Sequence, residues 1–221
     1  MQVLRNPTPD NSAASIVRHC VEEEALAITE LSKNLDVKAI ELAVDLVSKC
    51  QGKILTSGVG KSWYVAEKLA ATLASTGTVA YPIDALHAGH GDSGNIRFGD
   101  VGIFFSKSGS TRELLLMLPL FKSRGVPVIA IVGDINSPLA LQADVILDAT
   151  VSKETCPFNR VPTTSVTIAL VLGNALAVAV MIAKGITIDI FADNHPDGKL
   201  GEILQLQIAK QIAELRSSTS P

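Results

Sequence analysis

The sequence predicts an α/β fold, a three-layer αβα sandwich around a mainly parallel, five-stranded sheet. Strand-like apolar runs alternate with helix-like runs from Lys53 to Leu147, and right-handed crossovers join such strands into a parallel sheet. Two of these strand-like runs end in polar turns of small residues that lead directly into helices. With 221 residues the chain can bury one sizeable core, so we expect one domain over 1–221, with its core at about 15–201 and a C-terminal helix and tail over 202–221.

The first fifty residues favour two packing helices. Ser12 is a suitable N-cap for one helix and Asp36 for the other, because short polar side chains accept hydrogen bonds from the first free N–H groups of a helix. Apolar residues follow each cap at helical spacing, at 16, 21, 26 and 28 and then at 37, 40, 44 and 47.

The central part supplies the sheet. Short apolar runs rich in β-branched residues predict strands, and longer runs between them predict helices. Strands are expected at Lys53–Ser57, Val79–Tyr81, Val101–Phe105, Val126–Val132 and Asp144–Leu147, and helices at Ser62–Ser75, Thr111–Ser123 and Ser137–Gln142, with a loop rich in Gly and His that ends at Asn95.

The segment Val161–Ala183 contains no charged residue, and its length is enough for a membrane span. A membrane helix is the weaker interpretation, because Pro162-Thr-Thr-Ser165 is typical of a helix start and the segment follows a series of βα units. A helix buried in a core or an oligomer interface is equally apolar. A turn around Asp189–Phe191, a polar helix from Leu200 to Arg216 and a frayed end at 217–221 are expected after it.

The composition argues against several classes of protein. The 19 Lys and Arg are scattered among 22 Asp and Glu, for a net charge of −3 and a pI of about 5.8, so the basic stripe of a nucleic-acid binder is missing. Three cysteines form no CxxC pair, which favours a reduced, cytoplasmic protein without a zinc site. No signal peptide is expected in Met1–Ser12, and the high apolar content favours self-association.

The two turns Gly58-Val-Gly-Lys-Ser62 and Ser106-Lys-Ser-Gly-Ser-Thr111 predict a divided anion site. A helix N-terminus that follows a small-residue turn presents unpaired N–H groups and the positive end of the helix dipole. Trp63 stands where a dinucleotide fingerprint needs its third glycine, and no GxxxxGK[ST] loop occurs. A small phosphate group therefore fits better than a nucleotide.

Seven motifs in order give the chain a resemblance to the sugar isomerase (SIS) domain of D-arabinose 5-phosphate isomerases, over about Ser15 to Gly201. The resemblance implies a flavodoxin-like sheet, and it points to the short form of the family, without the C-terminal pair of cystathionine-β-synthase-like modules. The motifs are Gly58-Val-Gly-Lys-Ser62, Ala74-Ser-Thr-Gly77, His90-Gly-Asp92, Ser106-x-Ser-Gly-x-Thr-x-Glu113, Lys153-Glu-x-Cys-Pro157, Pro162-Thr-Thr-Ser165 and His195-Pro-x-Gly198.

The same resemblance implies site residues. Lys61, Glu113, Glu154 and His195 match positions associated with catalysis. Substrate contacts are implied for Ser62, His90, Ser106, Lys107, Ser108, Thr111 and Thr164. For the base that moves a proton between C1 and C2 we expect a carboxylate, with Glu154 slightly preferred to Glu113. Lys61 then stabilises enediolate or phosphate charge, and His195 opens the ring or moves oxygen-bound protons.

The expected activity is the interconversion of D-ribulose 5-phosphate and D-arabinose 5-phosphate through an enediolate, without a cofactor, in a homotetramer that feeds synthesis of the eight-carbon acid Kdo. A neighbouring subunit is a possible source of His195. Two alternatives stay open, another phosphosugar isomerase of the hexulose 6-phosphate type and a sensor that binds sugar phosphate without turnover. No metal, nucleic-acid or membrane partner is expected, although His87, His90 and Asp92 are possible ligands of an incidental metal.

Overall fold

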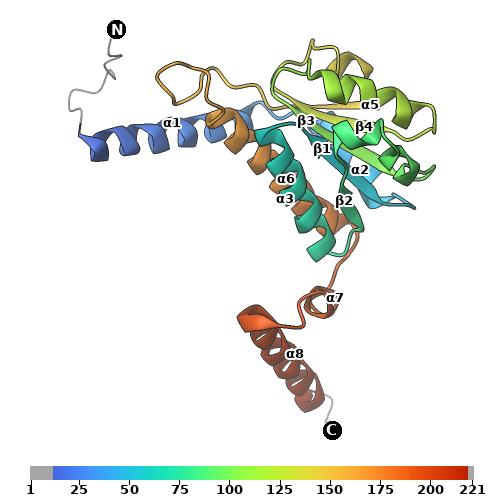
Figure 1. The fold of residues 1–221 in the computed structure, drawn as a ribbon. Helices are drawn as coiled ribbons and strands as arrows, with labels where there is room; N and C mark the ends of the chain where they lie inside the picture. Colours follow the sequence, from blue (N-terminus) through green and yellow to red (C-terminus); the bar gives the residue numbers. More distant parts are fainter. Residues whose placement is uncertain (1–11, 219–221) are drawn as a thin grey trace.

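The sheet contains five parallel strands in the order β2-β1-β3-β4-β5 (Figure 1). The computed structural model describes residues 12–218. Ile54 of β1 lies opposite Ala80 on one side and Val101 on the other, and all neighbouring strands run in the same direction. The predicted α/β class is therefore confirmed. The strands are β1 (Ile54–Gly58), β2 (Ala80–Pro82), β3 (Val101–Ser106), β4 (Val128–Val132) and β5 (Val145–Asp148).

Helices cover both faces of the sheet. One face packs against α2 (Val37–Ser48), α3 (Lys61–Ser75) and α6 (Thr164–Ala183). The other packs against α5 (Arg112–Lys122), together with the short α4 (Ala85–Ala88) and the 3-10 helix η2 (Ala140–Gln142). The sheet is thus the middle layer of three, as predicted.

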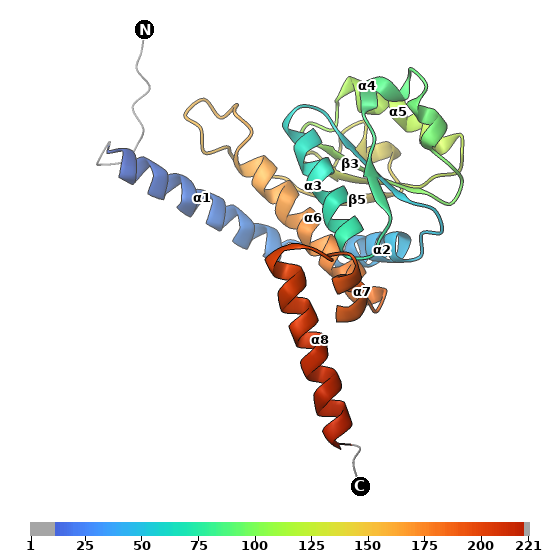
Figure 2. The same ribbon diagram turned by 60° about the horizontal axis from the view of Figure 1, so that its bottom comes forward.

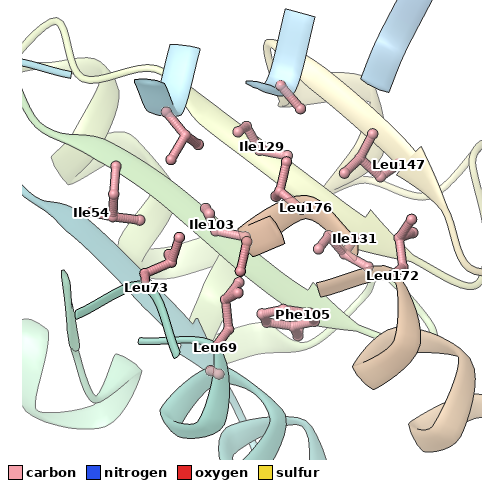
Figure 3. Close-up of a cluster of buried hydrophobic side chains, with 14 of the residues drawn as sticks. Ile54, Leu69, Leu73, Ile103, Phe105, Ile129, Ile131, Leu147, Leu172 and Leu176 are labelled. Carbon is pink, nitrogen blue, oxygen red and sulfur yellow. The ribbon is translucent and has the colours of Figure 1, made fainter. Parts of the chain in front are cut away.

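The central strands are apolar on both sides because both faces are covered. All six residues of β3 and all five of β4 are buried. In Figure 3, Phe105 of β3 lies beside Leu69 of α3, and Ile131 of β4 lies beside Leu172 of α6. This packing fixes the carboxyl ends of β3 and β4 relative to the helices that begin beside them.

The first two helices begin at the predicted caps. Ser12 accepts a hydrogen bond from the backbone N–H of Ser15, and Asp36 accepts one from that of Ala39. The first helix is α1 (Ala13–Lys33), which buries no residue and extends away from the sheet (Figures 1 and 2). Ile28 and Leu31 near its C-terminal end pack against the core, whereas Val17 and Val21 near its N-terminal end are exposed and available for contacts outside the monomer.

The uncharged segment forms α6, which is long and apolar enough by composition to cross a membrane. It buries Ile168, Leu172, Leu176 and Val180 against the sheet and neighbouring helices. A core helix of this kind passes the same length test as a membrane span, so the packing favours the buried-helix interpretation over the membrane interpretation.

Several connections differ in detail from the predictions. The segment expected to be a loop up to Asn95 contains α4 and the 3-10 helix η1 (Asp92–Asn95), each of four residues and too short to show helical periodicity. The turn around Asp189 is α7 (Ile188–Asp193), and the last helix, α8, spans Gly198–Ser218. Residues 1–11 and 219–221 lie outside the described residues. They include most of the start, where no signal peptide is expected, and most of the end that is expected to be frayed.

Candidate functional site

A cavity of about 310 Å³ lies at the carboxyl ends of β1, β3 and β4. In a sheet of this order, the crossovers from β1 and β3 leave toward opposite faces, and the crevice at that switch point is the usual ligand site. Both predicted turns reach the cavity, which also borders Ser165 at the start of α6. The polar turn residues that line it are Lys61, Ser62, Ser106, Lys107, Ser108 and Thr111.

Hydrogen bonds within the β3–α5 turn fix its hydroxyl groups. The backbone N–H of Gly109 donates to Ser106 Oγ at 3.0 Å, and Ser106 Oγ lies 2.8 Å from Thr111 Oγ1. The N–H of Ser110 donates to Ser108 Oγ at 3.2 Å. One of the Ser106 and Thr111 hydroxyls donates to the other, and a hydroxyl that only accepts still has its own proton to donate, so the turn keeps hydroxyl donors for an anion.

Two helix N-termini face this cavity without side-chain caps. The N-cap of α3 is Gly60 and that of α5 is Thr111, and neither makes a capping hydrogen bond through a side chain. The first N–H groups of each helix therefore have no side-chain acceptor from the cap position. Together with the helix dipoles, they favour an anion between the two turns.

Glu154 is buried beside the cavity, and its side chain has no exposed surface. Its Oε1 accepts hydrogen bonds from Lys107 Nζ and Ser165 Oγ, both at 2.5 Å. Its Oε2 accepts hydrogen bonds from the N–H and the hydroxyl of Thr163 and from the N–H of Ser165, at 2.9 to 3.1 Å. Burial alone raises the pKa of the Glu154 carboxyl, but the hydrogen bonds from Lys107, Ser165 and Thr163 outweigh burial and hold that pKa at about 2.

Three other predicted residues, Glu113, His90 and Thr164, do not line the cavity. Glu113 is partly exposed in the first turn of α5, two residues after Thr111. His90 is exposed between α4 and η1. Thr164 is buried at the first position of α6, where its Oγ1 has no hydrogen-bond partner among the described residues. None of these three side chains is among the described residues that line the cavity.

His195 lies at the opposite end of α3 from the cavity. Its Nδ1 is 2.7 Å from the carbonyl oxygen of Phe191, and its ring lies against the Phe191 ring with centroids 4.2 Å apart and planes tilted by 38°. The preceding Asn194 donates to the carbonyl of Ser75 at the end of α3, whereas Lys61 begins that helix. Fifteen helical residues span about 22 Å, so one chain does not bring His195 and Lys61 together.

Two residues of this site carried no role in the sequence analysis. Gly133, directly after β4, lines the cavity, and its position at the end of a third parallel strand was an available signal. Ser165 was expected only as part of a helix start, but it also donates to Glu154. Nothing in the sequence indicates that pairing, because the two residues meet only when the loop folds back on α6.

The described part of the chain contains no group of three His, Cys, Asp or Glu side chains that is arranged to hold a metal ion. His87 Nδ1 lies 3.6 Å from Asp84 Oδ2, on the exposed surface near α4. The expected absence of a cofactor stays a prediction.

Comparisons with known proteins identify the family and several similar proteins. A family model described as the SIS domain matches residues 48–179. The chain is 46% identical over 166 residues to arabinose 5-phosphate isomerase KdsD of Pseudomonas aeruginosa, a match that covers 75% of this chain and 51% of that protein. It is 39% identical over 208 residues to arabinose 5-phosphate isomerase KpsF of Escherichia coli, covering 91% and 64%. The chain thus spans about half to two thirds of the length of these relatives.

A solved structure resembles the fold over most of the chain. This is the c3406 protein of E. coli CFT073 in complex with arabinose 5-phosphate, which superposes with a TM-score of 0.80 at 33% sequence identity. The match covers 86% of this chain and 100% of that one.

Proposed function

Since the chain belongs to the SIS-domain family, we propose that it is an aldose–ketose isomerase that interconverts D-ribulose 5-phosphate and D-arabinose 5-phosphate. The observation that carries this proposal is the cavity between two uncapped helix N-termini, lined by the hydroxyls of Ser62, Ser106, Ser108 and Thr111. The names of KdsD and KpsF support the choice of reaction. The product then feeds Kdo synthesis in the cytoplasm.

The phosphate occupies the space between the β1–α3 and β3–α5 turns in this proposal. Hydroxyl groups and free N–H groups of the two helices donate to its oxygens, as in other anion sites at helix N-termini. The sugar extends toward Lys61 and the start of α5, which brings its carbonyl near a cation and the Glu113 carboxylate. His90 and Thr164 stay predicted contacts of the sugar.

The reaction needs a base that removes a proton next to the carbonyl and returns it to the neighbouring carbon. The sequence favoured Glu154 slightly, but five donors surround its two oxygens, which offer about four lone-pair sites. Glu113 is partly exposed in the first turn of α5, two residues after the cavity-lining Thr111. We therefore assign the proton transfer to Glu113 and the stabilisation of the enediolate to Lys61.

His195 enters the site from a neighbouring subunit in this proposal, because its own cavity is a helix length away. Exposed apolar side chains support self-association. Val17 and Val21 on α1 are each 63% exposed, Ile182 at the end of α6 is 73% exposed and Leu206 on α8 is 71% exposed. A homotetramer without cofactor is the assembly that we propose, with His195 as the carrier of oxygen-bound protons.

The test is incubation of the purified protein with D-ribulose 5-phosphate, with the pentose phosphates resolved by NMR. We expect D-arabinose 5-phosphate from the wild type and none from K61A, with inorganic phosphate binding retained in K61A. Turnover of a hexulose 6-phosphate instead would identify another phosphosugar isomerase. Tight binding of sugar phosphates with no turnover of any would contradict the enzyme proposal and favour a sensor.

A further inference from the structure

Lys107 lines the cavity from a constrained position in the β3–α5 turn. Its carbonyl oxygen accepts a hydrogen bond from the N–H of Gly133 at 3.1 Å. A Cβ atom on Gly133 would lie 2.7 Å from that oxygen and 3.4 Å from Cγ of Lys107. Glycine at the end of β4 thus lets the backbone and the first part of the Lys107 side chain pack closely against it.

Glu154 holds the other end of this side chain. Lys107 Nζ is 2.5 Å from Glu154 Oε1, and the lysine side chain is 45% exposed whereas that of Glu154 is fully covered. An ammonium group has three N–H donors, and Glu154 is the acceptor for one of them among residues 12–218. The remaining N–H donors of Lys107, which lines the cavity, are therefore available to a ligand.

Glu154 is itself fixed by the start of α6. The N–H groups of Thr163 and Ser165 donate to Oε2, so the carboxylate satisfies free donors at a helix N-terminus. The backbone N–H of Glu154 donates to Asn159 Oδ1 at 2.7 Å. A carboxylate that is held in this way has no free direction from which to take a proton from a sugar, but it can keep a neighbouring cation in place.

We propose that Glu154 is a positioning residue that holds the Lys107 ammonium over the cavity, where Lys107 contacts the phosphate of the substrate. This inference deepens the proposed function and rests on it for the identity of the sugar. Lys107 balances the Glu154 charge and four uncharged donors stabilise it, so loss of the carboxylate chiefly releases Lys107 and relieves little repulsion on a bound anion. A released lysine loses more side-chain freedom when it binds, and the affinity for phosphate falls.

A double-mutant cycle with inorganic phosphate as the probe tests the pairing, by calorimetric titration of wild type, K107Q, E154Q and the double variant. We expect the phosphate Kd to rise about tenfold in K107Q and about threefold in E154Q. In the K107Q background, E154Q should raise the phosphate Kd by less than about a further twofold, because the effect of Glu154 depends on Lys107. K122Q removes the same charge from the exposed end of α5 and should leave the Kd unchanged.

Turnover of D-ribulose 5-phosphate separates a positioning role from a base. E154Q should keep kcat within about fivefold and raise KM, whereas loss of a general base lowers kcat by about 10² or more. A fall of that size in E154Q, with the phosphate Kd unchanged, would overturn the proposal, as would tighter phosphate binding or additive effects in the cycle. If E154Q does not fold, E154D, which keeps the charge but withdraws it by one methylene, replaces it in both assays.

The two proposals fail in different ways. A wild-type protein that binds phosphate but does not convert D-ribulose 5-phosphate contradicts the proposed function, while the phosphate cycle still decides the role of Glu154. Unchanged phosphate binding in K107Q contradicts the Lys107 contact, whatever the sugar turns out to be.

Discussion

At the scale of single residues, Gly109 shows how tightly the β3–α5 turn is built. Its φ of 57° lies in the left-handed region, and its carbonyl accepts a hydrogen bond from the N–H of Leu139 at 2.9 Å. A Cβ atom at this position would lie 1.8 Å from Ser137 Oγ. Both the backbone conformation and the lack of space therefore require glycine in the turn that carries the hydroxyls proposed to bind phosphate.

We expect G109A to lower the apparent free energy of unfolding by about 2 kcal/mol or more, because the left-handed conformation alone costs about 1–2 kcal/mol for alanine. Urea denaturation of G109A and wild type measures this change in the free energy of unfolding. G94A is the matched control, since a Cβ on Gly94 meets no atom within 4 Å and its φ is not in the left-handed region. Equal stability of the two variants would contradict the packing described for the turn.

The lowered pKa of Glu154 predicts how stability depends on pH. The carboxyl pKa is about 2 in the folded protein, against an ordinary value of 4.5. The carboxylate therefore stabilises the fold fully above about pH 5, and this contribution is lost as the pH falls from about 4.5 to 2. The stability difference between wild type and E154Q should be constant from pH 7 to 5 and shrink below pH 4.5.

Urea titrations between pH 7 and pH 3 check this dependence. E41Q, at an exposed glutamate of α2, serves as the control for the change of charge alone. The same stability difference for E154Q at pH 3 as at pH 7 would show that the hydrogen bonds to Glu154 do not persist in solution.

At the scale of elements, α5 has one face in the core and one in solvent. Leu118 is completely buried next to β3 and β4, whereas Leu116 on the same helix is 65% exposed. The helix starts at Thr111 beside the cavity, so its packing also positions the turn before it.

L118A should lower the free energy of unfolding by about 2–5 kcal/mol through lost burial and the cavity that it leaves. L116A removes the same atoms from an exposed position and should change stability by less than about 0.5 kcal/mol. Thermal unfolding of both variants compares them directly. A larger loss for L116A than for L118A would mean that the outer face of α5 is covered in the assembled protein.

At the scale of the whole molecule, the proposed site is incomplete in one chain, because His195 and Lys61 lie at opposite ends of α3. Complementation between subunits tests the proposed assembly. K61A and H195A homo-oligomers should each be nearly inactive, and mixed oligomers formed by co-refolding should regain activity, since some sites then combine an intact Lys61 with an intact His195. Mixed oligomers verified by mass spectrometry but without activity would contradict the supply of His195 by a neighbouring subunit.

Much of this architecture was predictable from the sequence, and the reasons for the exceptions are physical. Local sequence pattern predicts the apolar runs of β3 and β4, and from them the sheet. It also predicts the turns at Gly58 and Ser106, and from them the position of the cavity. The hydrogen-bond partners of Glu154 could not be predicted from local pattern, because Lys107 is 47 residues away in the sequence and Ser165 is 11 residues away. The distance of His195 from the cavity is likewise a property of the folded chain.

The most direct test of the proposed isomerase is the reaction of D-ribulose 5-phosphate in D₂O. Transfer through an enediolate exposes the moving proton to exchange on the base, whereas a direct hydride shift does not. We predict D-arabinose 5-phosphate that carries deuterium at C2, and its loss in E113Q with D-ribulose 5-phosphate binding retained. Absence of D-arabinose 5-phosphate, or its formation without deuterium at any extent of reaction, would contradict the proposed chemistry.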